Sequence, residues 1–320
     1  MNFGKRGVFF TFAAIFLVIL IISVSTTKTT FRYQQKGYAI TSRVRAMNTF
    51  LTDMENDLDR ELYIGGYRAL LGMQKYIRIK EGFIENPIII FSEIFINGTA
   101  NGTTIDLMYQ EGRGADLTSW VSRINEEANK LNIDLIIIPN NISLEMISPW
   151  ITRISASFTI NVTDENKIAS FEYNKTFYKE ISIIGFEDPL YTVYTDDKVS
   201  NLIFATTVSD FVDDATNSTE GLMLHLNMSY YNATGFGPDF LMRFSGNLSA
   251  SAYGIESMIN LEDLQKQGIS VKNQSVVDYI YFGTTSPPNY CNVQNMPSWF
   301  IIDIADASGY EVNKLEKETC

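Results

Sequence analysis

A run of apolar residues near the start of the chain is its strongest hydropathy feature. From Val8 to Val24 only Thr11 and Ser23 are polar, and Lys5 and Arg6 precede the run. Its 17 residues are at the short end of the range for a membrane-spanning helix and just beyond the range for a signal-peptide core. The run therefore predicts a permanent anchor, a cleaved export signal or the assembly helix of a pilus-like subunit.

Cleavage of an export signal would be expected after Ser25, because Ser23 and Ser25 form a small-x-small pair. The distribution of cations does not choose an orientation for an anchor. Lys5 and Arg6 lie before the run, and Lys28 and other cations follow it closely.

Apolar residues next recur at the spacing of a helix. They lie three or four residues apart from Ile40 to Leu58, and the pattern continues from Leu62 to Ile77. This predicts, after a short hinge, an amphipathic helix of roughly 35–40 residues, in which Gly65 and Gly66 could mark a break. Further on, residues 83–110 mix apolar runs with turn signals, and the run FIENPIIIFSEIFI fits either a strand or a short helix.

A second helix is predicted from Asp116 to Leu131. Asp116 is a suitable N-cap, and Trp120, Ile124 and Ala128 share one apolar stripe with Leu131. Together with the long helix, this makes the first half of the chain helix-rich.

From Ile142 onward, apolar and polar residues alternate as they do in strands. Strand-like stretches recur at intervals of roughly ten residues, and a short helix near Ile255–Gln267 interrupts them. They are ITRISASFTINVT, IASFEY, ISIIG, YTVYT, NLIFATTV, LMLHLNMSYY, VVDYIYFG and SWFIIDIA. This spacing predicts a mainly antiparallel, sandwich-like β domain.

The predicted fold class is therefore α+β, in three parts. Residues 1–25 form the signal or transmembrane anchor, residues 26–140 a helix-rich stalk and subdomain, and residues 141–320 the mainly β exterior domain. The boundary is expected near Pro139–Asn141.

Composition adds a strongly acidic surface. The 320 residues carry a formal net charge of −12, and 45% of them are hydrophobic, so a real core is expected rather than disorder. Beyond residue 25 there are 23 cations and 37 anions, a net charge of −14. Such a surface repels phosphate backbones and argues against nucleic acid as a partner.

Asn-x-Ser/Thr sequons are unusually frequent. Random placement of the Asn, Ser and Thr residues would give roughly four, and a chain rich in these residues can also collect sequons passively. We favour the alternative, a glycosylated exterior domain. The ten candidate acceptors are Asn97, Asn101, Asn141, Asn161, Asn174, Asn217, Asn227, Asn232, Asn247 and Asn273.

The only two cysteines are Cys291 and Cys320. A disulfide between them is compatible with an exported domain, and two free thiols are the alternative. They are too far apart in sequence for a CxxC redox motif.

Signatures of catalysis are weak throughout. His225, the only histidine, is predicted to lie exposed on a strand, and one histidine with two distant cysteines cannot build an ordinary zinc site. Asp210, Asp213 and Asp214 are weak calcium candidates, because acidic loops in acidic proteins are usually only solvated. No hydrolase elbow, Walker loop or dinucleotide fingerprint occurs, so we predict no enzymatic activity and no cofactor.

The stretch MNFGKRGVFFTFAAIFLVILIISV resembles the class III signal peptides of archaeal type IV pilin-like proteins. The resemblance implies processing after Gly7 and before Val8. Phe12 departs from it, because assembling pilins usually carry Glu at this place. Later stretches, such as ISIIGFEDPLYTV and MPSWFIIDI, look like a group of uncharacterised archaeal membrane-anchored surface proteins.

These observations predict a single-pass protein of the cell membrane whose large C-terminal domain is extracellular. Its expected role is structural or interactive, for example as a minor pilin-like subunit with envelope or pilus-like partners. A tethered receptor for solutes or glycans is the alternative and would need a concave aromatic pocket. A tethered hydrolase would need converging carboxylates.

Overall fold

The computed structural model describes residues 5–110, 113–283 and 289–315. The protein is α+β, as predicted, and its described residues form two compact units. The first unit comprises the described residues of Met1–Asn56, Asn125–Ile136 and Ile160–Tyr173. The second comprises those of Asp57–Ile124, Ile137–Thr159 and Asn174–Cys320.

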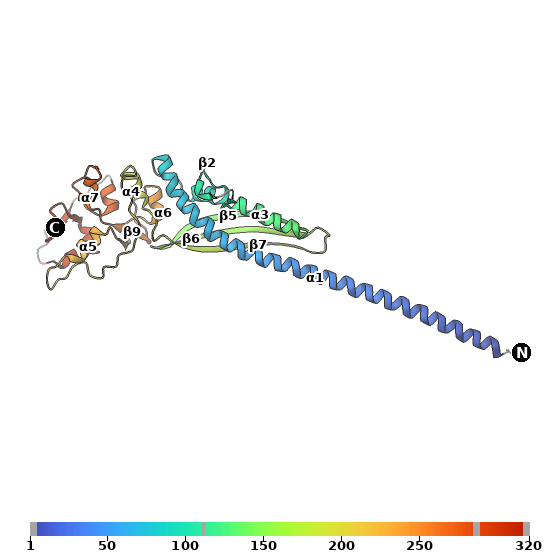
Figure 1. Ribbon diagram of the computed structural model, residues 1–320. Coiled ribbons are helices and arrows are strands. Elements are labelled where there is room, and N and C mark those ends of the chain that lie inside the picture. Colours follow the sequence, from blue (N-terminus) through green and yellow to red (C-terminus); the bar gives the residue numbers. More distant parts are fainter. Residues whose placement is uncertain (1–4, 111–112, 284–288, 316–320) are drawn as a thin grey trace. The chain divides into compact units, whose positions relative to one another are not determined.

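Helix α1 (Lys5–Lys80) is continuous over 76 residues (Figure 1). Neither the predicted hinge nor a break at Gly65 and Gly66 occurs. These glycines instead allow close packing, since a Cβ atom on Gly66 would lie 2.1 Å from the Ile154 Cδ1 atom. Their lack of a side chain is therefore used for tertiary contact, and the helix tolerates their lower propensity.

The predicted apolar stripe of α1 is buried from Met47 onward. In the first unit Met47, Leu51 and Met54 are at most 7% exposed, whereas Ile40 is 48% exposed. In the second unit the stripe continues to the end of the helix as Leu58, Leu62, Ala69, Leu70, Met73 and Ile77. Amphipathic spacing in the sequence thus predicted this core correctly.

In the first unit, Arg43 joins α1 to the two segments beside it. Its guanidinium donates to the backbone carbonyls of Leu131, at 2.7 Å, and Asn132, at 2.8 Å, and pairs with the Asp164 carboxylate. Burial is the largest single influence on Asp164 and favours its neutral form, but the hydrogen bond and charge of Arg43, together with hydrogen bonds from backbone amides, outweigh it and lower the pKa of that carboxyl. One cation therefore satisfies three acceptors at once.

Short elements follow α1. Helix α2 (Pro87–Asn97) resolves the strand-or-helix ambiguity, with Asn86 as its N-cap and Gly98 at φ 70° ending it. Helix α3 (Leu117–Lys130) confirms the second predicted helix. Asp116 caps it, because its Oδ1 accepts from the Ser119 amide at 2.8 Å. Between them lie β1 (Thr99–Ala100), β2 (Thr103–Thr104), η1 (Asp106–Met108), β3 (Tyr109–Gln110) and β4 (Arg113–Gly114).

Three long strands form one sheet, in the order β5-β6-β7 (Figure 1). They are β5 (Ile133–Ser148), β6 (Ile151–Asp164) and β7 (Ser170–Ser182). Along β6 every second side chain is buried, which confirms the alternation read from the sequence. The other sheets described are two-stranded, so a sandwich is not confirmed. Pro139–Asn141, the expected domain boundary, lies inside β5.

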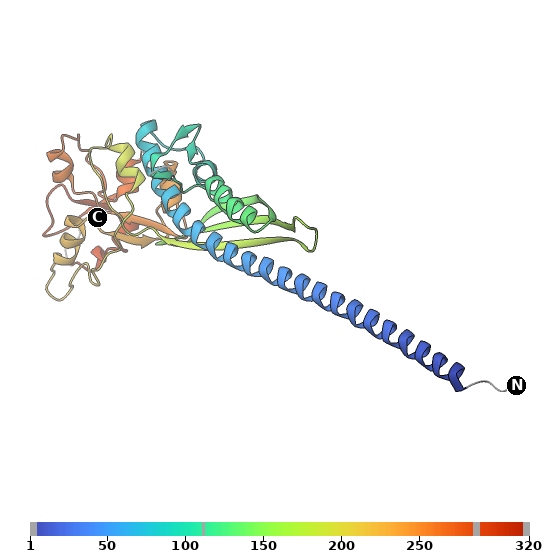
Figure 2. The same ribbon diagram turned by 45° about the vertical axis from the view of Figure 1, so that its right-hand side comes forward.

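The C-terminal part of the chain consists of short helices and two-stranded pairs (Figure 2). Strands β8 (Tyr231–Thr234) and β9 (Gly254–Ser257) pair antiparallel, as do β10 (Tyr290–Asn292) and β11 (Ile301–Asp303). The elements are α4 (Pro189–Tyr194), α5 (Glu220–Asn227), β8 (Tyr231–Thr234), α6 (Phe240–Phe244), β9 (Gly254–Ser257), α7 (Leu261–Lys266), α8 (Asp278–Phe282), β10 (Tyr290–Asn292), β11 (Ile301–Asp303), α9 (Ile304–Ala307) and η2 (Val312–Lys314).

Four strand predictions in this part are wrong. YTVYT lies in α4, LMLHLNM in α5 and DYIYF in α8, and NLIFATTV forms only isolated bridges. In α5 the buried residues are Leu222, His225 and Leu226, which is the i, i+3, i+4 spacing of a helix. Apolar runs this short fit both periods, and here the helix caps decide: Asp188 caps α4 and Pro189 begins it.

Candidate functional site

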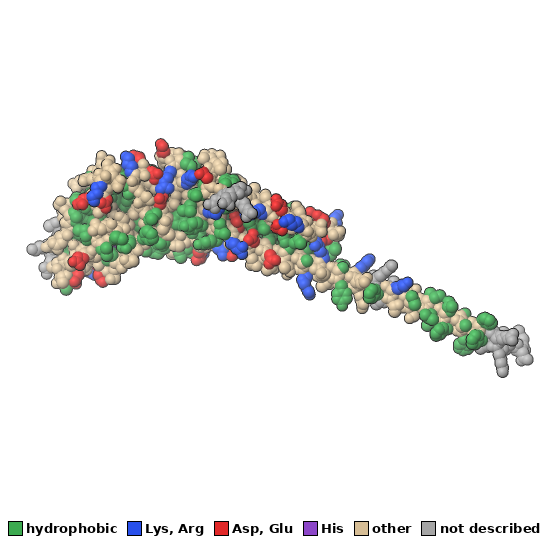
Figure 3. Space-filling model, viewed as in Figure 1, with side chains coloured by type: hydrophobic (Ala, Val, Ile, Leu, Met, Phe, Trp, Pro, Cys, Tyr) green, Lys and Arg blue, Asp and Glu red, His purple; other side chains and the backbone are tan. Residues whose placement is uncertain are grey.

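The N-terminal part of α1 is the most exposed apolar surface described. Phe9–Lys28 has a mean hydropathy of 2.5 over 20 residues, and none of it is buried (Figure 3). At 1.5 Å per residue it is long enough to cross a bilayer core of about 30 Å. A signal sequence near the N-terminus would satisfy the same test. Gly7 and Val8 lie in the first turns of α1, and their side chains are outside the described structure.

Hydroxyl groups at the end of this segment are satisfied within the helix. Thr26 Oγ1 donates to the Ile22 carbonyl at 3.0 Å, and Thr27 Oγ1 donates to the Ser23 carbonyl at 2.9 Å. Such back-bonding lets polar side chains enter an apolar medium without unpaired donors. These two hydroxyl groups are therefore compatible with a hydrocarbon environment at the end of the segment.

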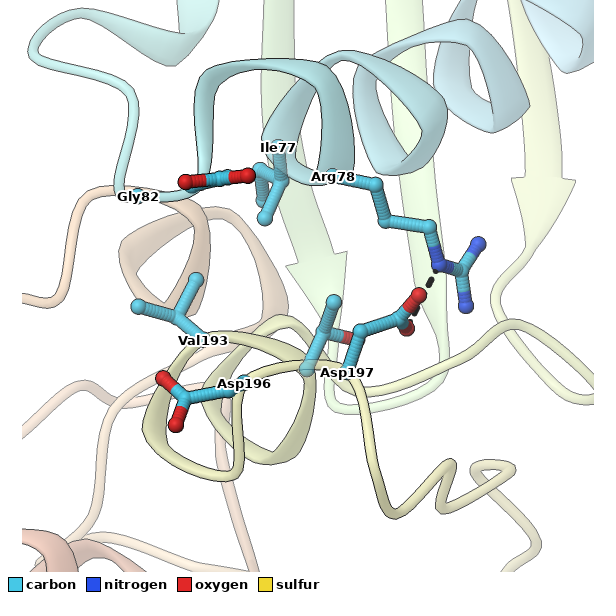
Figure 4. Close-up of a pocket in the computed structure, with 8 residues that line it drawn as sticks. Ile77, Arg78, Gly82, Val193, Asp196 and Asp197 are labelled. Carbon is cyan, nitrogen blue, oxygen red and sulfur yellow. Dashed lines mark hydrogen bonds and ion pairs between the residues drawn. The ribbon is translucent and has the colours of Figure 1, made fainter.

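A pocket of about 370 Å³ lies between the end of α1 and the end of α4 (Figure 4). Arg78 reaches across from α1, and its Nε donates to Asp197 Oδ1 at 2.7 Å. Glu81, Asp196 and Asp197 all have positive φ, because both helices end there in tight turns. None of the eight lining residues is aromatic, namely Ile77, Arg78, Glu81, Gly82, Thr192, Val193, Asp196 and Asp197. The pocket thus lacks the stacking platform that a glycan receptor would need.

The second unit buries an ionic network around Arg243. Arg243 Nη1 lies 2.5 Å from Asp188 Oδ2 and 2.8 Å from Asp278 Oδ2, and all three side chains are inaccessible to solvent. Tyr231 OH donates to Asp188 Oδ2 at 2.7 Å. Burial lowers the pKa of the guanidinium, but the two carboxylates outweigh it and hold that pKa above its ordinary value. Arg243 is therefore charged and links three segments of the fold.

A second group of buried acids lies around Asp306. Tyr279 OH donates to Asp306 Oδ2 at 2.9 Å, and Asp303 Oδ2 accepts from the Asp306 amide at 3.3 Å. Burial, followed by the charge of Asp303, raises the pKa of Asp306 to about 7. Burial also raises the pKa of Glu256 well above its ordinary value, with Asp306 as the next cause. Glu256 Oε2 and Asp306 Oδ1 are buried without a hydrogen-bond partner.

Raised pKa values in carboxyl groups can mark a general acid. Here Glu256 and Asp306, the carboxyls of this group with raised pKa, are each only 2% exposed, so no substrate can reach them in this structure. Their enclosure points to a structural role, in which bound protons neutralise these carboxyl groups instead of paired cations.

His225 is buried on α5, and the prediction of an exposed strand residue is wrong. Its ring packs edge-on against Phe211, with centroids 5.2 Å apart, and its Nδ1 lies 3.1 Å from Thr206 Oγ1. Burial lowers the pKa of His225 to about 4, so the ring is neutral at pH 7. The alternation LMLHLNM placed His225 opposite the leucines of a strand, whereas the helix places it beside Leu222 and Leu226.

The calcium candidates do not converge. Asp213 is used within its own turn, accepting from the Ala215 amide at 3.0 Å and from Thr216 Oγ1 at 2.7 Å, while Asp210 accepts from Ser209 Oγ. Among the residues that the structure describes, no three His, Cys, Asp or Glu side chains are arranged to hold a metal ion.

Cys291 is buried on β10 and forms a disulfide. Cys320 lies outside the described residues. Of the ten sequon asparagines, none is fully buried: Asn161, Asn217 and Asn232 are half-buried and the other seven are exposed. All ten lie in the described part of the chain, so glycosylation stays a prediction that their exposure permits.

The buried Arg243 network was missed by sequence reasoning. Glu187–Asp188–Pro189 was expected to be a structural turn, and Asp188 does cap α4. Nothing local shows that the same carboxylate meets Arg243, which is 55 residues away. The one available signal is a lone cation inside the apolar run FLMRF.

Comparisons of the sequence with protein-family models and with curated proteins, and of the fold with solved structures, find no match. The resemblance of the leader to pilin-like signal peptides therefore stays a prediction.

Proposed function

We propose that this protein is a membrane-anchored, glycosylated cell-surface protein with a structural or interaction role, and that it acts as a minor pilin-like subunit. One observation carries the proposal. A single helix, α1, supplies both an uncovered apolar segment of membrane-spanning length and the buried stripe of a folded domain.

Exposure of this apolar segment to water is unfavourable, so an apolar environment is expected to cover it. Twelve large hydrophobic side chains between Phe9 and Val24 are 45–73% exposed. Burying each would contribute about 2 kcal/mol, or roughly 24 kcal/mol in total, which exceeds the usual net stability of a whole domain. A bilayer, or a bundle of like helices, would supply that cover.

The continuity of α1 favours an anchor over a disposable signal. A signal peptide is cut from a separate domain, but here the helix runs without a break into Met47 and on to Ile77 in the core. Cleavage after Ser25 would leave the turns of α1 from Thr26 to Ala46 ahead of Met47, the first buried residue described.

Two further observations support the proposed role. The exposure of the sequon asparagines is compatible with glycans, and the surface beyond the N-terminal segment is acidic. Because the acids with raised pKa are enclosed, catalysis gains no support from them. A structural or interaction role is therefore favoured.

The test is mass spectrometry of the intact N-terminus of protein purified from native membranes. A start at Val8 would support pilin-type processing, and a start at Met1 or Asn2 would support a permanent anchor without it. A start at Thr26 would refute anchoring by α1. Treatment of the same sample with a deglycosylating reagent should lower its mass, and an unchanged mass would refute glycosylation.

A further inference from the structure

The charges of the chain are segregated along its length. Residues 1–52 contain seven Lys and Arg and no Asp or Glu, for a net charge of +7. The remaining residues contain 18 cations and 37 acids, for a net charge of −19. The basic part includes the apolar segment and the turns of α1 that follow it. This pattern calls for a partner with negative charge next to the apolar segment.

Three cations follow the apolar segment on one stripe of α1. Lys28, Arg32 and Lys36 are spaced four residues apart, so they succeed one another along nearly the same side of the helix. At 1.5 Å per residue, Arg32 lies about 6 Å and Lys36 about 12 Å beyond Lys28. Lys28 is the last residue of the apolar segment.

These distances match the layer in which lipid headgroups lie. The polar layer on each side of a bilayer is roughly 5–8 Å thick, and the Debye length at physiological salt is about 8 Å. If Phe9–Lys28 spans the hydrocarbon core, the helix backbone at Lys28 and at position 32 lies within the headgroup layer, and the backbone at Lys36 lies within one Debye length of it. Cations farther along α1, at Arg43 and Arg45, are too distant to take part.

The side chains around the stripe suit the same layer. Phe31 is 61% exposed and Tyr38 is 76% exposed, and aromatic rings favour the boundary between hydrocarbon and water. A shallow groove on the helix surface is lined by Thr27, Lys28, Phe31 and Gln35. Two of its lining residues, Lys28 and Gln35, carry hydrogen-bond donors, and a third, Phe31, carries an apolar ring.

We propose that the segment Lys28–Tyr38 of α1 binds the phosphate groups of anionic lipids in the leaflet where the apolar segment ends. This inference rests on the proposed anchoring by Phe9–Lys28. Each cation near an anionic bilayer surface favours binding roughly fivefold. The acidic remainder of the chain is repelled by the same surface, so the stripe also offsets that repulsion.

The experiment uses the full chain in vesicles made of equal parts phosphatidylcholine and phosphatidylglycerol. The protein is extracted into a mild non-ionic detergent, and the lipids that stay with it are quantified by mass spectrometry. We expect phosphatidylglycerol to exceed phosphatidylcholine several-fold and the excess to shrink as salt rises. The variant K28Q/R32Q/K36Q should retain a much smaller excess, because only Lys5 and Arg6, at the other end of the apolar segment, remain.

A matched control removes three cations elsewhere. Lys130, Lys266 and Lys314 each form an exposed pair with an acid three residues away, and such pairs contribute little to stability. The variant K130Q/K266Q/K314Q should retain the full excess of phosphatidylglycerol. Equal amounts of both lipids on the unchanged protein would overturn the inference.

Two other outcomes separate the inference from its premise. If the stripe instead pairs with the acidic surface of a second copy, K28Q/R32Q/K36Q will lower the yield of crosslinked dimers in phosphatidylcholine vesicles without changing the retained lipids, which would overturn lipid binding. If alkaline carbonate removes the unchanged protein from the vesicles, the anchoring itself fails. Retention after carbonate with no lipid preference would refute only the inference drawn here.

Discussion

Five carboxyl groups are buried in the C-terminal part of the second unit, at Asp188, Glu256, Asp278, Asp303 and Asp306. Arg243 is the only fully buried Lys or Arg among the residues that the structure describes. If all five were ionised, this core would carry four uncompensated negative charges, which a low-dielectric interior does not tolerate. Some of them must hold protons at neutral pH, and folding must therefore become more favourable as the pH falls.

The size of this effect follows from two groups. The pKa of Asp306 rises from 3.8 to about 7, and that of Glu61 on α1 rises from 4.5 to about 7, in both cases chiefly through burial. A carboxyl whose folded pKa is raised stabilises the fold fully below its unfolded pKa, and this stabilisation is lost as the pH rises through about 7. Between pH 7 and pH 5 each group contributes about 2 kcal/mol. Glu256 acts in the same direction.

His225 acts in the opposite direction. Its pKa is lowered from 6.5 to about 4 by burial, so the unfolded chain takes up a proton before the folded chain does. Stability is lost as the pH falls from about 6.5 to about 4, and the loss between pH 7 and pH 5 is about 2 kcal/mol. Carboxyls whose pKa is lowered, such as Asp213, stay ionised over this range and contribute nothing to the slope.

The two buried acids together outweigh the histidine, so we expect the free energy of unfolding to increase by about 2 kcal/mol or more from pH 7 to pH 5. This corresponds to a rise in Tm of roughly 4–8 °C for a domain of this size. Thermal unfolding of the full chain in a non-ionic detergent, followed by tryptophan fluorescence, would measure it.

Two variants should move the slope in opposite directions. Asp306→Asn removes one raised acid and should reduce the increase by about 2 kcal/mol, whereas His225→Gln removes the opposing group and should enlarge it by a similar amount. A Tm that stays level or falls from pH 7 to pH 5 in the unchanged protein would refute the reasoning. So would a slope that neither variant alters.

Three further predictions concern the same fold, each measured as a change in Tm at pH 7. Arg243→Met leaves two buried carboxylates without their cation and should cost about 3–5 kcal/mol, so a cost below about 1 kcal/mol would mean that the acids are already neutral. Gly221→Ala places a Cβ 2.1 Å from the Asp210 carbonyl oxygen and should cost about 1–3 kcal/mol, whereas Gly235→Ala, with open space around it, should change little. Asp116→Ala removes the N-cap of α3 and should cost about 1 kcal/mol, and Asp116→Asn should recover most of that loss.

The elements that could be predicted from the sequence are those in which one periodic pattern of apolar residues extends over many residues. The stripe of α1 repeats over about eight turns, and β6 alternates over 14 residues, so each pattern fits one kind of element only. The breaks were harder to place. Gly65 and Gly66 look like a helix break in sequence, and only the approach of Ile154 shows why glycines stand there.

The C-terminal part was mispredicted because its elements are shorter than either period can establish. Helices α4 and α8 have six and five residues, fewer than two turns, so their apolar residues resemble those of a buried strand. Their identity depends on end groups and on distant contacts, such as Tyr191 against Phe282. Tertiary packing outweighs local preference in segments of this length.

The candidate sites also differ in whether the sequence could predict them. The apolar segment and the basic stripe are properties of consecutive residues, and the sequence contains them in full. The ionic network brings together Asp188, Arg243 and Asp278 from three separate elements, so no local pattern could reveal it.

Burial of carboxyl groups also changes the net charge that the composition implies. A formal charge of −12 counts every carboxyl as ionised, but burial raises the pKa of Asp306 and of Glu61 to about 7, so both are partly protonated at neutral pH, and it favours the protonated form of Glu256 as well. The folded chain is therefore less negative at pH 7 than its sequence states, and the difference must appear as protons released when it unfolds.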